Sequence, residues 1–223
     1  MAKRVEGAGL GGDFVRIPVL DQSRDAHMPI HTGRLVLAPQ DAVQAPRLAD
    51  LVPGLQAARF LGPSLHLATD ATQGINAYAV GDDFLHLVSF TGCAVQVDVA
   101  PMPGRPFCHI RIVGPWPYPG PILGANTRPP RCPVCRAMLR DWRDRLTAGP
   151  SSRGENDPGL SCEACGTERP AWAWDWKDTG GFARLSVYIE EIFPGEAIPT
   201  DALMSLLSDL SAMPWRHFYV QDG

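Results

Sequence analysis

Short runs of alternating apolar and polar residues dominate the first half of the chain and predict a body rich in β-strands. The predicted strands lie at residues 14–20, 34–37, 84–90, 93–99 and 107–113. Thr91 and Gly92 separate the third run from the fourth, as the turn of an antiparallel hairpin would. In the fourth and fifth runs the polar residues share one parity, which is typical of a sheet with one wetter face.

Glycine and proline limit the length of the helices. The chain contains 22 of each, so we expect few long helices and many loops. The apolar spacing at 41–61 is close to helical, but Pro46 and Pro53 should reduce this stretch to short helical turns. Another short helix is expected at 71–80. Six prolines make residues 114–130 a stiff, extended connector.

The closing stretch returns to regular structure. Strands are expected at 185–189 and 215–220, and Thr200 is a suitable N-cap for a helix between them. The apolar stripe of that helix consists of Leu203, Leu206, Leu207, Leu210 and Met213. A strand, a helix and a strand in so short a stretch suggest a βαβ unit with a right-handed crossover. The predicted fold class is therefore α+β: a mainly antiparallel sheet body with a C-terminal strand–helix–strand unit.

Composition sets the outer limits on the class of protein. The chain has 223 residues, 45% of them hydrophobic, and a formal net charge of −4. This length supports one good core and a small satellite, and the slight acidity argues against a dedicated nucleic-acid binder. Residues 1–7 contain no apolar signal region, and no apolar run approaches the ~18 residues that span a membrane. We therefore expect a cytoplasmic protein with reduced cysteines and no membrane partner.

Four cysteines carry the sharpest chemical signal. Two residues separate Cys132 from Cys135, and two residues separate Cys162 from Cys165. Each spacing lets both sulfurs reach one ion from a tight turn, so the two turns supply the four ligands of a tetrahedral zinc site. Gly166 follows the second pair, where the backbone often takes a positive φ. Unrelated reduced thiols, iron, a cluster and a redox dithiol are the alternatives.

These cysteine pairs resemble the zinc-ribbon (rubredoxin-like) motif, and the resemblance covers residues 130–178. Arg136 stands where that motif usually has glycine, and the interval between the pairs is longer than usual. The resemblance implies one zinc ion bound by all four cysteines. A structural role is expected because four thiolates leave no open position for water or substrate. No histidine lies between His109 and His217 to replace one of them.

The predicted domain organisation places the zinc module at 128–180, as an insertion in an α+β body formed by 1–127 and 181–223. Within the module, residues 136–146 should form a short amphipathic helix, because three large apolar residues fall on one helical face. Residues 147–159 are polar and rich in glycine, so they should form a loop.

Tryptophan and arginine mark a candidate partner-binding surface on this module. Trp172, Trp174 and Trp176 alternate, so in a strand all three would share one face. The full candidate set is Trp142, Trp172, Trp174, Trp176, Arg136 and Arg140. In the alternative interpretation the tryptophans form the small core of the module. The arginines would then offset the negative charge of the zinc–thiolate centre or pair with Asp141 and Asp144 along the helix.

The predicted function is that of a non-catalytic zinc-binding protein whose structural zinc supports a protein-interaction surface. One alternative is an enzyme with a pocket in the sheet body and a remote zinc. Its acid–base candidates are Glu190, Glu191, His86, His109 and Asp98, but no nucleophile elbow, phosphate loop or dinucleotide fingerprint accompanies them. The other alternative is nucleic-acid binding through the arginines and tryptophans of the module.

Overall fold

A six-stranded antiparallel sheet forms the body of the protein. The computed structural model describes residues 33–66, 75–91, 97–100, 106–148, 159–193 and 195–221. The strand order in the sheet is β12-β1-β10-β5-β3-β2, and every neighbouring pair is antiparallel. The bounds are β1 Gly33–Pro39, β2 Leu61–Leu65, β3 Ile75–Val80, β5 Ile110–Val113, β10 Ser186–Ile192 and β12 Trp215–Gln221. The predicted α+β class is confirmed.

Three two-stranded pairs and several helices complete the described part of the chain. The small pairs are β4 (Val88–Phe90) with β11 (Ala197–Pro199), β6 (Gly120–Ile122) with β9 (Gly181–Ala183), and β7 (Leu160–Ser161) with β8 (Glu168–Arg169). The helices are α1 (Leu48–Ala57), α2 (Phe84–Leu87), α3 (Trp142–Ala148) and α4 (Asp201–Ser211), with 3-10 turns η1 (Ala171–Ala173) and η2 (Lys177–Thr179). No helix among these residues is long and apolar enough to cross a membrane.

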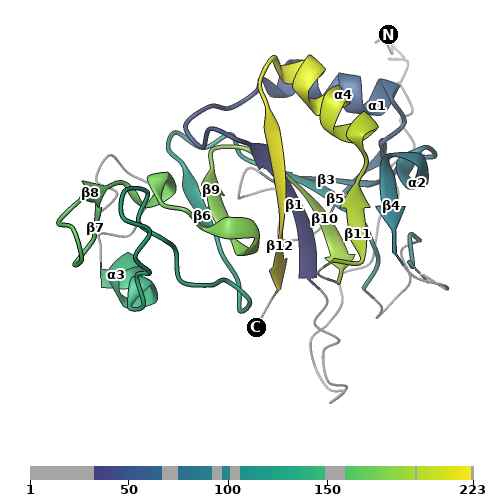
Figure 1. Ribbon diagram of the computed structural model, residues 1–223. Coiled ribbons are helices and arrows are strands. Elements are labelled where there is room, and N and C mark those ends of the chain that lie inside the picture. The colour runs from purple at the N-terminus through teal and green to yellow at the C-terminus, as the bar shows by residue number, and fades with distance from the viewer. Residues whose placement is uncertain are drawn as a thin grey trace, which may run out of the picture.

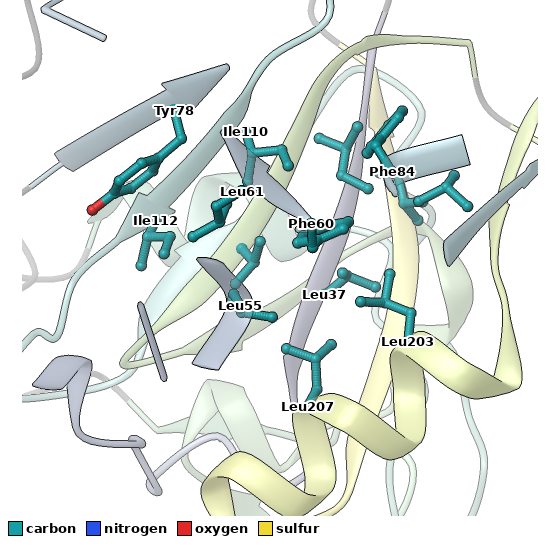
Figure 2. Close-up of a cluster of buried hydrophobic side chains, with 14 of the residues drawn as sticks. Leu37, Leu55, Phe60, Leu61, Tyr78, Phe84, Ile110, Ile112, Leu203 and Leu207 are labelled. Carbon is teal, nitrogen blue, oxygen red and sulfur yellow. The ribbon is translucent and has the colours of Figure 1, made fainter. Parts of the chain in front are cut away.

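The main core lies between one face of the sheet and the helices α1 and α4, which sit together on that face (Figure 1). Leu37 of β1 packs in this layer with Leu55 of α1 and with Leu203 and Leu207 of α4 (Figure 2). Residues of the opposite parity, such as Val36, belong to a second buried cluster on the other face of the sheet. Strand β1 is therefore buried on both faces, which explains its continuous apolar run.

The C-terminal strand–helix–strand unit is present, with one strand inserted into it. Thr200 is the N-cap of α4, and its hydroxyl accepts a hydrogen bond from the Leu203 backbone N–H at 3.3 Å. Strands β10 and β12 run parallel to each other because each is antiparallel to β1, which lies between them. The helix thus crosses over a strand from the other end of the chain, and both strands join the sheet as predicted.

Three of the predicted elements in the body are wrong. Residues 84–90 begin with the helical turn α2 before β4, because Phe84 is buried against Phe60 with ring centroids 5.9 Å apart. Residues 75–80 form the strand β3 rather than the end of a helix. The stretch expected to break into turns contains the ten-residue helix α1 with Pro53 inside it. Burial of its Leu51 and Leu55 outweighs the one backbone hydrogen bond that proline cannot make.

Some predictions fall on residues outside the described part of the chain. These are the strand at 14–20, most of the strand at 93–99 with its hairpin turn, and most of the loop at 147–159. Residues 97–99 are described and are not in a strand.

The segment that carries the cysteines leaves the body after β6 and returns at β9, and these two strands pair with each other. Ile122 stands opposite Gly181 in that pair. Between them, α3, β7 and β8 lie to one side of the sheet, away from α1 and α4 (Figure 1). This segment has its own buried cluster, which is separate from the main core. The exact boundaries at 128 and 180 stay a prediction.

Candidate metal centre

Two turns of the same geometry hold the four cysteines. In the first, the Arg136 N–H donates to the Cys132 carbonyl at 3.1 Å and the Cys132 N–H donates to the Ala137 carbonyl at 2.8 Å. In the second, the Gly166 and Cys162 N–H groups make the equivalent bonds at 2.8 and 2.8 Å. Arg136 has a φ of 67° and Gly166 a φ of 71°. The arginine therefore adopts the left-handed conformation that glycine takes more readily.

The four sulfurs converge. The Sγ atoms of Cys132, Cys135, Cys162 and Cys165 all lie within 4.8 Å of one another. Across the two turns, Cys132 Sγ is 3.8 Å from Cys165 Sγ, and Cys135 Sγ is 3.5 Å from Cys162 Sγ. A tetrahedron with a Zn–S bond of about 2.3 Å has sulfurs about 3.8 Å apart. Four sulfurs at this separation could hold one metal ion.

The electrostatics of the cluster favour a cation at its centre. Hydrogen bonding with Thr167 lowers the pKa of the Cys165 thiol to about 6, and a backbone N–H of Cys135 lowers the pKa of Cys132. The backbone of Ala137 also favours the Cys135 thiolate, but the neighbouring sulfurs outweigh it and raise the pKa of Cys135 to about 12. The pKa values of Cys132, Cys135 and Cys165 differ because neighbouring groups perturb each thiol, and a positive ion among them would favour the thiolate form of each.

A small aromatic core supports the cluster. Cys132 and Cys162 are buried in the same apolar group as Trp142, Trp174 and Trp176. The ring of Trp176 meets that of Trp142 edge-on with centroids 5.2 Å apart, and its indole Nε1 donates to the Ala171 carbonyl at 2.8 Å. These three tryptophans are 3%, 4% and 2% exposed, which agrees with the interpretation of the tryptophans as core.

The tryptophan row does not form a strand, so the alternation that would put all three rings on one face of a strand does not apply. Trp172 lies in the 3-10 turn η1 and is half-buried, unlike the other three. The helix predicted at 136–146 begins only at Trp142. Residues 138 and 139 instead pair with the backbone just before Cys132. Arg131 and Met138 form a β-bridge, and the Leu139 N–H donates to the Pro130 carbonyl at 3.0 Å.

Most of the arginines around the cluster have partners within the module. Arg136 forms an ion pair with Asp175 at 2.7 Å, and Arg145 bridges Asp141, at 2.7 Å, and Glu163. Arg143 stacks over the Trp142 ring at 4.3 Å. Arg140 is exposed, and its side chain makes no ion pair or hydrogen bond within the described residues. Of the predicted partner-binding set, Arg136, Arg140 and Trp172 are at least partly accessible.

A pocket that the sequence did not predict lies beside the cysteines. Residues 137–141 and 162–164, together with Trp174, enclose about 380 Å³. The lining comes from three separate parts of the chain, 137–141, 162–164 and Trp174, so no local pattern could have indicated the pocket.

Described residues of the sheet body line a second pocket, smaller than the one beside the cysteines. This pocket of about 230 Å³ is lined by Val113, Trp116, Gly120, Pro121, Ile122, Ala183, Ser186 and Tyr188, without a histidine or a carboxylate. His86 lies on α2, and the His109 carbonyl accepts a hydrogen bond from the Glu190 N–H at 2.9 Å. The Glu190 side chain is 8% exposed and pairs with Arg111 at 3.0 Å and Arg34 at 3.4 Å.

Comparison of the chain with protein-family models, with curated proteins and with solved structures gave no match. The resemblance to zinc ribbons therefore depends on the cysteine pairs and their turns. No other group of three or more histidine, cysteine or acidic residues within the described ranges has its ligand atoms so close together.

Proposed function

We propose that this protein binds one zinc ion through its four cysteines and uses the metal-stabilised module as a surface for a protein partner. The convergence of four sulfurs within 4.8 Å carries this proposal. Zinc fits the donor set best, since four thiolates in paired tight turns are the ligands of structural zinc sites.

A structural role follows from the same donor set. Four protein ligands fill the tetrahedral shell, so the ion has no open position for substrate or water. The tryptophan cluster gives the module only a small apolar core, and small modules of this kind commonly depend on a metal for their stability. Zinc would supply the order that a larger core supplies elsewhere.

The surface of the module supports the recognition part of the proposal. Val134 is 62% exposed and Met138 is 50% exposed, and both lie close in sequence to the first cysteine turn. Arg140 is exposed two residues after Met138, and Trp172, further along the module, is partly accessible; tryptophan and arginine contribute strongly at protein interfaces. A cytoplasmic location belongs to the proposal, since the thiols must stay reduced.

Metal analysis of the purified full-length protein tests the zinc. We expect about one zinc per chain, and loss of zinc in Cys135→Ser and Cys165→Ser. Cys108→Ala serves as the control, because Cys108 is buried in the main core. Iron in place of zinc, or a metal-free protein with an intact module, would contradict the proposal.

A pull-down tests the recognition part separately. The wild type and a Trp172→Ala/Arg140→Ala variant, both loaded with zinc, are compared for the proteins that they retain. Retention of the same proteins by both would remove the interaction surface from the proposal while leaving the metal site in place.

A further inference from the structure

The pocket beside the cysteines has an unusual pair of polar groups. Trp174 is 4% exposed and forms one of its walls, yet the indole Nε1 has no hydrogen-bond partner within the described residues. A buried donor left without an acceptor costs about 1–3 kcal/mol, so such groups usually have a partner in the working state. Arg140, which also lines the pocket, has an exposed guanidinium with no ion pair there. Both groups are donors that lack an acceptor.

The two acidic residues of the pocket already form ion pairs within the protein. Asp141 and Glu163 both pair with Arg145 of α3. Arg140 is therefore the charged residue of the lining without an ion pair in the described part of the chain. A polyanion such as nucleic acid would nevertheless meet these two carboxylates and the thiolates next to them, which disfavours it. The lining suits a ligand with one localised negative charge.

Apart from Cys162, one of the candidate metal ligands, the remaining lining is apolar. Ala137, Leu139 and Ala164 contribute to it, and Met138 adds a flexible side chain that is 50% exposed. Methionine adapts its shape to varied apolar partners. A volume of about 380 Å³ is at the small end of the range for ligand sites, ~300–1,000 Å³, and suits a few side chains of an extended peptide.

We propose that this pocket binds a short segment of a partner protein, with an Asp or Glu carboxylate against Arg140 and a neighbouring apolar side chain against Met138. The Trp174 indole N–H donates to an oxygen of the same segment after a small adjustment of the wall. This inference depends on the proposed function, because the zinc ion that joins the two cysteine turns would also hold the two sides of the pocket together.

Selection from a displayed library of random hexapeptides, on the zinc-loaded full-length protein, tests the inference. We expect the selected peptides to contain Asp or Glu beside an apolar residue. Their affinity should fall about tenfold in Arg140→Ala, since charge-assisted hydrogen bonds are the strong ones. It should fall about fivefold in Trp174→Phe, which keeps an aromatic ring and removes the donor. Arg128→Ala removes an exposed arginine that does not line the pocket and should leave affinity unchanged.

Each contrary outcome has a distinct meaning. Selected peptides without an acidic residue, an empty selection, or equal affinity in wild type and Arg140→Ala would overturn the pocket assignment while leaving the zinc site intact. Preference for a single-stranded oligonucleotide probe over the peptides would overturn the class of partner. A protein without zinc would overturn the proposed function itself. Zinc content and thermal stability measured for Trp174→Phe show whether its loss of affinity comes from a folding defect. If it does, the affinity of Arg140→Ala alone tests the pocket assignment.

Discussion

Replacement of Trp176 by alanine tests whether the tryptophan row is the core of the module. Trp176 is 2% exposed and touches the rings of Trp142, at 5.2 Å, and Phe182, at 5.4 Å. Phe182 belongs to β9, so Trp176 joins the cysteine-bearing segment to the strand that anchors it. Truncation of a fully buried tryptophan costs about 3–5 kcal/mol.

The expected size of the effect can be expressed as a melting temperature. One kcal/mol corresponds to about 2–4 °C for a protein of this size, so Trp176→Ala should lower the Tm by about 6–20 °C. Trp176→Phe should cost about 1 kcal/mol, because it removes one of two hydrogen bonds to the Ala171 carbonyl and leaves the one from the Trp174 backbone N–H at 3.2 Å. Differential scanning calorimetry and denaturant titration followed by tryptophan fluorescence measure both.

Trp172→Ala is the matched control. This residue comes from the same row but is half-buried, so its truncation should cost about 1 kcal/mol. Trp176→Ala should also speed the release of zinc to a chromogenic chelator, since Cys132 and Cys162 share its cluster. A loss below about 1 kcal/mol in Trp176→Ala, or equal losses at both tryptophans, would refute the assignment of Trp176 to the core.

Three further predictions concern the body. Glu190→Gln should cost about 3 kcal/mol in denaturant titrations, because the buried carboxylate between two arginines loses its charge. An equal loss in Glu191→Gln would contradict this reasoning. Thr200→Ala should cost about 1 kcal/mol by removing the N-cap of α4; an unchanged transition midpoint would show that the cap is dispensable. Burial lowers the pKa of His217 despite the opposing charge of Asp178. The stability that His217 contributes is therefore present above its unfolded pKa of about 6.5 and is lost as pH falls below that value. His217→Gln should show a smaller drop in Tm than the wild type between about pH 7.5 and 5.5, and parallel curves would contradict it.

The clustering of the four cysteines could be predicted because its signal is local and chemical. Two Cys-x-x-Cys pairs specify ligand type, number and spacing, and nothing in the rest of the fold has to be known. The C-terminal helix could also be predicted from local sequence, since Thr200 marks its start and an apolar stripe marks its buried face. The strands β1, β5, β10 and β12 followed from short apolar runs in the same way.

Elements that depend on distant contacts could not be predicted. Residues 84–87 have strand-forming side chains, yet burial of Phe84 beside Phe60 selects a helical turn. The alternation of Trp172, Trp174 and Trp176 imitates that of a strand, although Trp172 lies in the 3-10 turn η1 and is half-buried while the other two are buried. The bulge at Glu191, with a φ of 61°, arises from the pairing of β10 with β1 and has no local signal.

The position of β1 between β10 and β12 has a consequence for synthesis of the chain. Residues 33–39 are translated early, but β10 begins at Ser186, about 150 residues further on, and β12 begins later still, at Trp215. At about 5–20 residues per second, a nascent chain holds β1 without its partners for roughly 7–30 s. An unpaired apolar strand is a template for aggregation during that time. We expect a chain truncated before β10 to need a chaperone throughout its lifetime, and the intact chain to need one until its last strand leaves the ribosome.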